Sequence, residues 1–256
     1  MLYQSSWDAF CSNLVYETTY FAAAASMTLG WSLRTQGRQH IPATGPALLI
    51  ANHQSFFDPL LVGLGTRRHL RFLARKTLFQ RPLFTWLIRM LNAVAIDQEG
   101  VGKEGIKTIL DQLHNGEAVV VFPEGTRTSN GLMQPLRPGI HLLIKRAQAP
   151  IIPVGIAGAF EAWPHWRTMP RPAPLFWPGC RATMAVSIGQ PLDARQFAQM
   201  QRAQALTELF GVIATEWRRA QKLRAGKIRP QAPDLGPAEL TSPAGPFPGP
   251  SRFSLS

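Results

Sequence analysis

The chain has few cysteines and none of the motifs that cysteine chemistry needs. Cys11 and Cys180 are the only two in 256 residues, and neither lies in a Cys-x-x-Cys pair or at a metal-ligand spacing from histidine. A disulfide framework and a zinc site are therefore not expected, and we predict no bound metal. No Gly-x-Ser-x-Gly segment occurs either, so the sequence gives no sign of a serine nucleophile at a strand-to-helix elbow.

Acidic residues are also scarce. The chain holds 15 Asp and Glu against 27 Lys and Arg, which gives a net charge of +12. This balance favours nucleic acid, an anionic membrane or a phosphorylated substrate as partner, and charge alone does not choose among them. A hydrophobic content of 45% with 16% charged residues is ample for the core of one α/β domain.

The N-terminal region lacks basic residues before Arg34, and Asp8 stands where a signal peptide would carry positive charge. A cleaved signal is therefore not expected. Residues 14–33 are long enough to cross a bilayer, but Glu17 and several Thr, Ser and Tyr interrupt them. Their aromatic side chains favour a headgroup boundary. We expect an interfacial or bundle-packed helix, and a helix packed on a soluble domain stays open.

Strand-like and helix-like segments alternate along the middle of the chain, which predicts an α/β fold with a mostly parallel or mixed central sheet flanked by helices. The expected strands are 46–51, 70–74, 92–96, 118–122, 151–158 and 182–188; the expected helices are 56–66, 78–91, 102–115, 137–148 and 194–222. The predicted organisation is an N-terminal membrane-associated helical segment (1–36), a main domain (37–225) and a disordered tail rich in Pro and Gly (226–256).

A first motif, NHQSFFD, follows the apolar run PALLI. His53 and Asp58 are five positions apart, about 140° around a helix, so they can meet only across a turn. Ser55 is a plausible N-cap, with Asp58 positioned to reach backward. The aspartate would then fix the tautomer of His53 and leave its other nitrogen to take a proton. The alternative is a capping box of Ser55 and Asp58 beside an incidental histidine.

A second motif, VVVFPEGTRT, is a buried strand that runs into a turn. Gly125 allows a close backbone approach, Thr126 stands beside it, and Arg127 beside free amides would suit an anion. Glu124 either holds the loop by pairing with a base or hydrogen-bonds the hydroxyl of an acceptor. The simpler alternative is a strand and turn with a surface arginine.

Taken together, NHQSFFD and FPEGTR resemble the paired signatures of the glycerolipid acyltransferases, the lysophosphatidic acid acyltransferases and their relatives. ARKTLFQRPLF is similar to the second block of that family, with Lys76 at its lysine, and APIIPVGIAG to the fourth block, with Pro153 at its proline. The resemblance runs from about residue 37 to 190. Some positions depart from the pattern: Thr85 and Asn92 stand where relatives commonly have glycines, and Gln98 stands where they commonly carry an arginine thought to help hold the acceptor's phosphate.

The resemblance implies an enzyme of phospholipid biosynthesis that transfers a fatty acyl group from acyl-CoA or acyl carrier protein to the hydroxyl of lysophosphatidic acid. His53 and Asp58 would be the general-base pair, and Lys76, Glu124, Gly125, Thr126 and Arg127 would bind substrate. No resident cofactor is implied, and the backbone amides after Asn52 are our expectation for the oxyanion donors. The partners would be lipid, acyl donor and an anionic membrane surface, without nucleic acid.

The expected location is the cytoplasmic face of the inner membrane, reached peripherally or through the N-terminal helix. Residues 78–91 and 162–179 mix aromatic and basic side chains, which suits such an interface. Because of Gln98, a different lyso-lipid acceptor is the main alternative. A basic membrane or nucleic-acid adaptor on a degenerate fold, and a thioesterase, are weaker interpretations, since the motif residues are retained and a hydrolase has little use for a phosphate clamp.

Overall fold

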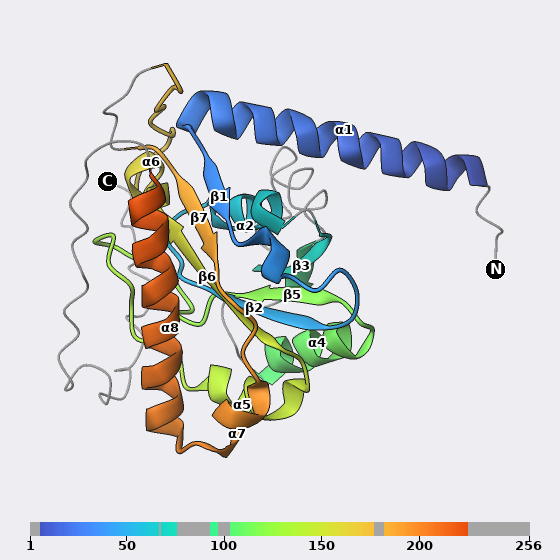
Figure 1. Cartoon of the computed structure of the whole chain (residues 1–256), viewed down its shortest axis with the longest axis vertical. Coiled ribbons are helices and arrows are strands. Elements are labelled where there is room, and N and C mark those ends of the chain that lie inside the picture. The colour runs from blue at the N-terminus through green and yellow to red at the C-terminus, as the bar shows by residue number, and fades with distance from the viewer. Residues whose placement is uncertain (1–5, 67, 76–92, 97–102, 177–181, 225–256) are drawn as a thin grey trace, which may run out of the picture.

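The computed structural model describes residues 6–66, 68–75, 93–96, 103–176 and 182–224, which form a seven-stranded sheet with helices on both faces (Figure 1). The spatial order is β1-β7-β6-β2-β5-β3-β4. The strands are β1 Arg34–Gln36, β2 Ala47–Ala51, β3 Leu70–Arg75, β4 Ala93–Ile96, β5 Ala118–Val121, β6 Ile151–Ala157 and β7 Ala185–Ile188. All neighbours are parallel except β6 and β7, so the prediction of a mixed α/β sheet is confirmed.

Five of these strands fall within the predicted ones, β3 extends one residue past its predicted end at 74, and β1 was missed. Its sequence, Arg-Thr-Gln, offers no apolar run, and it forms by pairing in parallel with β7 at the sheet edge. The helices are α1 Ser6–Trp31, α2 Asp58–Thr66, α4 Lys103–His114, α5 Gly139–Ala147, α6 Ala159–Ala162, α7 Ala194–Gln199 and α8 Arg202–Leu223, with a 3-10 turn, η1, at Arg38–His40. The helix predicted at 78–91 and the tail from 226 lie outside the described residues.

The prediction of one helix over 194–222 was wrong. Met200 and Gln201 have extended backbone angles, which end α7 and begin α8. The break changes the direction of the chain so that Phe197 of α7 and the apolar face of α8 fill the same core. Asp193 caps α7, because its side chain accepts from the backbone N–H of Arg195.

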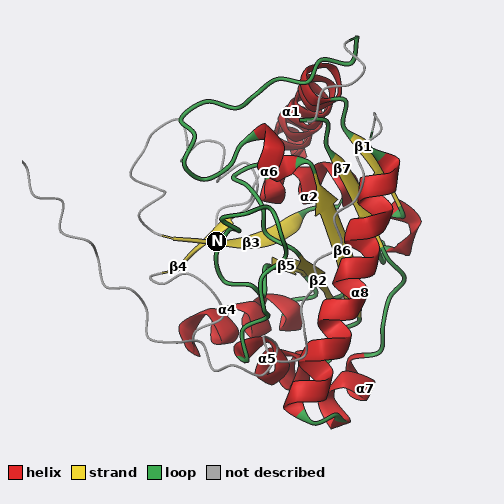
Figure 2. Cartoon of the chain, turned by 90° about the vertical axis from the view of Figure 1, so that its left-hand side faces the viewer, coloured by secondary structure: helices red, strands yellow, loops and turns green. Residues whose placement is uncertain are grey.

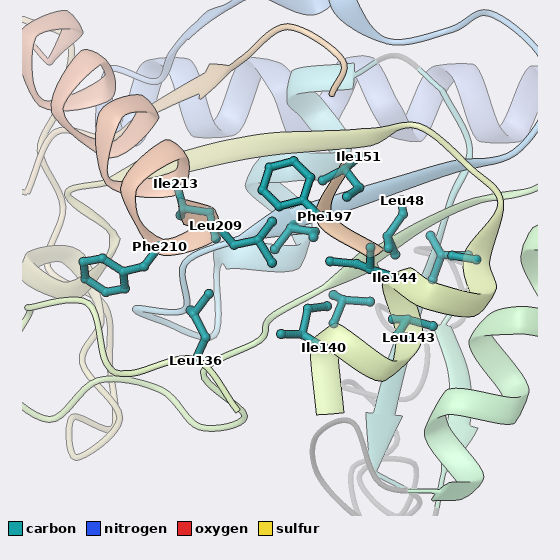
Figure 3. Close-up of a cluster of buried hydrophobic side chains, with 14 of the residues drawn as sticks. Leu48, Leu136, Ile140, Leu143, Ile144, Ile151, Phe197, Leu209, Phe210 and Ile213 are labelled. Atoms are coloured by element: carbon teal, nitrogen blue, oxygen red, sulfur yellow. The ribbon is translucent and has the colours of Figure 1, made fainter. Parts of the chain in front are cut away.

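The central strand β2 is buried on both faces and divides the interior into two cores. Leu48 and Ile50 face α4, α5, α7 and α8, a core whose side chains are drawn in Figure 3. Leu49 and Ala51 face the other side, toward α1 and α2. Figure 2 shows the resulting layers of helix, sheet and helix. Continuous apolar strands such as this one are typical of a parallel sheet covered on both faces.

The helix α8 lies very close to β6, and Gly155 makes this possible. A β-carbon at position 155 would stand 2.1 Å from the carbonyl carbon of Glu216 and 2.1 Å from the amide nitrogen of Trp217. Only glycine fits at that contact. The apolar block Ile151–Ala157 is therefore shaped for helix packing as well as for the sheet.

The helix α1 covers the predicted segment 14–33 except its last two residues, and it begins earlier than expected. Tyr20 donates a hydrogen bond of 2.8 Å from its hydroxyl to the carbonyl of Leu64 in α2. Phe21 and Leu29 are exposed on α1. Within the described part of the chain, no helix has the length and apolarity that crossing a membrane requires. Whether α1 binds a membrane surface stays a prediction.

Three neighbouring parallel strands, β6, β2 and β5, end at the same edge of the sheet. The segments that follow them are therefore brought together. They are Asn52 and His53 after β2, the turn Phe122–Arg127 after β5, and α6 with the segment beyond it after β6. Both motifs of the sequence thus meet at one place.

Candidate active site

The turn between β2 and α2 brings His53 and Asp58 together. The Nδ1 atom of His53 lies 2.7 Å from Oδ2 of Asp58. Because an ionised carboxylate can only accept, Nδ1 carries the proton and Nε2 is the basic nitrogen. The His53 side chain is 19% exposed, Asp58 is fully buried, and no described residue hydrogen-bonds Nε2. This geometry suits a general base held by an orienting carboxylate.

The same aspartate also builds the turn. Its Oδ2 atom accepts from the backbone N–H of Gln54 and, at 2.7 Å, from that of Ser55. The hydroxyl of Ser55 accepts from the N–H of Phe57 at 3.2 Å, as a cap does. The helix itself begins at Asp58, two residues after the predicted start. The two alternatives for Asp58 are therefore not exclusive, since one side chain caps the turn and orients the histidine.

The backbone of His53 is held from both sides by the second motif. Its N–H donates to Oε1 of Glu124 at 2.8 Å, and its carbonyl accepts from the N–H of Thr128 at 3.0 Å. The imidazole stacks on the ring of Phe122, with centroids 4.2 Å apart and planes 18° apart. The turn after β5 therefore fixes both the backbone and the ring plane of His53.

Glu124 is buried and binds two backbone amides. Besides the N–H of His53, it accepts from the N–H of Gln134 through Oε2 at 2.7 Å. The pKa of Glu124 is raised to about 8, mainly by burial. The backbone amides of Gln134 and His53 lower the pKa, and the negative charge of Asp58 raises it. Both oxygens are occupied, so the structure favours the loop-holding alternative over contact with a substrate hydroxyl.

The remaining loop residues lie in the turn that the second motif forms. Gly125 has a φ of 76°, and a β-carbon there would stand 3.2 Å from Cγ of Arg137, so this position needs glycine. Thr126 is exposed. The guanidinium of Arg127 lies over the ring of Phe56, 3.6 Å from its centroid. A cation held on an aromatic face beside His53 suits an anionic group of a substrate.

Asn52 cross-links β2 to β6, where its amide group imitates a peptide. Its Nδ2 donates to the carbonyl of Ile156 at 2.9 Å, and its Oδ1 accepts from the N–H of the same residue at 2.7 Å. The expectation that the amides after Asn52 bind an oxyanion was wrong, because the amides of residues 53, 54 and 55 all donate to Glu124 or Asp58.

Some predicted positions cannot be placed, and some contributors were missed. Lys76 and Gln98 lie outside the described residues. Sequence reasoning did not find Trp163, whose ring contacts Phe56 and Phe57 with centroids 5.2 Å and 5.0 Å away, and whose carbonyl accepts from the hydroxyl of Ser55 at 2.7 Å. Only its place after β6, which ends at the same edge as β2, could have suggested it.

Comparison with known proteins finds acyltransferases. Residues 32–157, which contain both motifs, match the model of the acyltransferase family, and the chain is an enzyme of the acyltransferase type. It is similar to the 1-acyl-sn-glycerol-3-phosphate acyltransferase of Bacillus subtilis, with 27% identity over 78% of this chain and 90% of that protein. The enzyme of the same name from Streptococcus pneumoniae is 26% identical over 78% of this chain and 72% of its own length.

Among solved structures, the chain is similar to the crystal structure of the 1-acyl-sn-glycerophosphate (LPA) acyltransferase PlsC from Thermotoga maritima. The TM-score is 0.64 at 23% identity, covering 81% of this chain and 78% of the other. At that identity the likeness establishes the fold alone, an α/β sheet flanked by helices.

We expect Asp58→Ala to lower the free energy of unfolding by about 1–3 kcal/mol, because two buried backbone N–H groups lose their acceptor. Asp58→Asn keeps an oxygen for those amides and should retain most of the stability. Both variants should lose turnover, since neither supports an imidazolium with a negative charge. Urea unfolding and initial rates measure the two effects.

The control for the Asp58 variants is Asp193→Ala, which removes the exposed cap of α7. It should lower stability by about 1 kcal/mol and leave turnover unchanged. Full turnover in Asp58→Asn would contradict the charge role. An unfolding change in Asp58→Ala no larger than that of Asp193→Ala would contradict its role in the turn.

For Glu124→Gln we expect a loss of about 1–3 kcal/mol, because the amide NH₂ would face a buried N–H donor. Glu117→Gln, at the half-buried ion pair of 2.9 Å with Arg71, is the control and should cost about 0–1 kcal/mol. The folded-state pKa of Glu124 is about 8, above the ordinary 4.5. The stabilisation that the Glu124 carboxyl provides is therefore complete below pH 4.5 and is lost as the pH rises through about 8.

The difference in unfolding free energy between the wild type and Glu124→Gln should accordingly narrow as the pH rises from about 5 to about 8. Urea titrations across this window measure it. A difference that stays constant or widens as the pH rises would show that the pKa of Glu124 is not raised in the folded protein.

Proposed function

We propose that this enzyme transfers a fatty acyl group from an acyl thioester, acyl-CoA or acyl-ACP, to the free hydroxyl of lysophosphatidic acid, giving phosphatidic acid. The observation that carries the proposal is the 2.7 Å contact between His53 and Asp58 at the carboxyl edge of the sheet. The names of the relatives from B. subtilis and S. pneumoniae support the choice of acceptor.

The proposed reaction is a direct acyl transfer. Nε2 of His53 removes the proton of the acceptor hydroxyl, whose oxygen attacks the thioester carbonyl. The tetrahedral intermediate collapses as the carbon–sulfur bond breaks, and the imidazolium returns its proton to the departing thiolate. The charge of Asp58 stabilises the imidazolium between these steps. The reaction forms no covalent enzyme intermediate and needs no resident metal or cofactor.

Arg127 is the proposed contact for the phosphate of the acceptor. Its guanidinium lies over the ring of Phe56, which is three residues after His53 in the sequence. Thr128, the residue after Arg127, donates its backbone N–H to the carbonyl of His53. A phosphate bound by Arg127 would therefore stand beside the base. Exposed Thr126 can add a hydroxyl from the same turn. We assign Lys76 the same kind of role from the family resemblance.

We further propose that the enzyme works at the cytoplasmic face of the cell membrane, where both acceptor and product reside. The net charge of +12 supports association with anionic lipid. The helix α1, with Phe21 and Leu29 exposed, supports contact with the surface.

The test is acyl transfer from palmitoyl-CoA and from palmitoyl-ACP to a panel of lyso-lipids with and without phosphate. We expect product with lysophosphatidic acid, and a fall of about a hundredfold or more in kcat for His53→Ala. His114→Ala, an exposed histidine at the end of α4, is the control and should be unchanged. Histidine-dependent product with another lyso-lipid alone would reassign the acceptor, as Gln98 suggests. Absence of transfer to every acceptor would refute the proposal.

A second test addresses the phosphate. Arg127→Ala should raise the KM for lysophosphatidic acid about 10- to 100-fold and the donor's KM much less, because a charge-assisted contact to the acceptor is lost. Arg146→Ala, at an exposed position on α5, is the matched control. Steady-state kinetics with both substrates varied measure the two constants. Equal increases in both would argue against a phosphate role.

A further inference from the structure

The segment that follows α6, residues 163–176, carries most of the exposed large apolar side chains of the described chain. We call it the strap. Trp166 is 58% exposed, Met169 72%, Leu175 45% and Phe176 82%. Three further large apolar side chains are exposed among the described residues, Phe21 and Leu29 on α1 and Leu142 on α5. A concentration of this kind over 14 residues indicates an interaction surface.

The strap is held in place along the end of α1. The N–H of Ala173 donates to the carbonyl of Gly30 at 2.8 Å, and that of Leu175 to Leu29 at 3.0 Å. The indole N–H of Trp31 donates to the carbonyl of Arg171 at 2.7 Å. Figure 1 shows the strap, in gold, beside that end of α1. Leu29 and Leu175 therefore belong to one continuous surface, which is fixed by backbone hydrogen bonds.

The charge of the strap selects its partner. Arg167 and Arg171 are exposed between the apolar side chains, and His165 is exposed beside them. No acidic residue occurs in the sequence between Glu161 and Asp193. Large apolar side chains interspersed with arginines suit the headgroup boundary of an anionic bilayer. A second copy of this chain, with its net charge of +12, would bring like charge against the same arginines.

The strap is also joined to the site. The ring of its first residue, Trp163, contacts Phe56 and Phe57 of the NHQSFFD motif. The backbone carbonyl of Trp163 accepts a hydrogen bond from the hydroxyl of Ser55. Trp166 contacts Phe160 of α6, with ring centroids 5.3 Å apart. A surface that binds the strap is therefore held at a fixed position relative to the turn that carries His53.

We propose that the strap, together with Leu29 of α1, is a docking surface for an anionic lipid bilayer and holds the His53 site at the membrane. The inference rests on the proposed function in taking lipid as the substrate. The apolar side chains enter the boundary between headgroups and acyl chains, and the two arginines bind lipid phosphates.

The experiment measures binding of the full chain to phosphatidylcholine vesicles with and without phosphatidylglycerol, by co-sedimentation. The apolar variant is Trp166→Ser with Phe176→Ser, and the basic variant is Arg167→Gln with Arg171→Gln. We expect the apolar variant to bind both kinds of vesicle about tenfold more weakly. The basic variant should lose most of the preference for vesicles that contain phosphatidylglycerol.

The matched controls are Leu142→Ser, an exposed leucine on α5, and Arg218→Gln, an exposed arginine on α8. Both should bind vesicles as the wild type does. Activity on an acceptor dispersed in detergent should be unchanged in the strap variants, which separates docking from chemistry and shows that the variants are folded.

Two outcomes would overturn the inference. One is wild-type vesicle binding in the apolar variant. The other is that light scattering shows a dimer for the wild type and a monomer for the apolar variant, while vesicle binding is unchanged. The strap would then bind a second copy of the chain and not a bilayer. If vesicle binding changes as expected and no acyl transfer to any acceptor is found, the proposed function fails while the docking surface stands.

Discussion

A single buried oxygen, Oδ2 of Asp58, organises the site. It accepts from Nδ1 of His53 and from the amides of Gln54 and Ser55. The two amides fix the turn between strand and helix, and the turn places the imidazole. The fold and the proposed chemistry thus depend on the same hydrogen bonds. A histidine and an aspartate five positions apart can meet in this way only because the chain turns between them before α2 begins.

Two carboxyl groups lie next to His53, and they make different contacts. Asp58 faces the imidazole, where a negative charge is useful. Glu124 is deeply buried and binds only backbone amides, and the negative charge of Asp58 helps to raise its pKa. Two like charges near each other in a buried site are unfavourable. A pKa of about 8 keeps Glu124 mostly neutral at pH 7, which removes that repulsion.

The sequence predicted most of the strands well, because they depend on local patterns, whereas the meeting of the two motifs was implied by the family resemblance. Apolar runs such as 46–51 and 151–158 are typical of strands buried in a parallel sheet, and parallel neighbours end at the same edge. It missed β1, whose three polar residues are extended only through pairing with β7. It also missed the break at Met200, which depends on how α7 and α8 share a core.

Within the site, the sequence predicted the pairing of His53 with Asp58, but not the partners that hold it. Contacts such as Trp163 with Phe56 and Phe57, or Phe122 with His53, are set by the packing of segments far apart in the chain. The amides after Asn52 looked available from the sequence alone. In the folded chain Glu124, 71 residues from His53, is one of the groups that binds them.

The place of the strap follows from the physics of the proposed substrate. Moving a fatty acyl chain from a bilayer into water costs about 0.8 kcal/mol per methylene group, so a lipid cannot readily diffuse to a distant site. An acyltransferase with a lipid acceptor therefore needs its base within reach of the bilayer surface. Here β6 ends beside β2, and the segment after β6 carries the exposed apolar and basic residues. One edge of the sheet can thus hold both the base and the contact with the membrane.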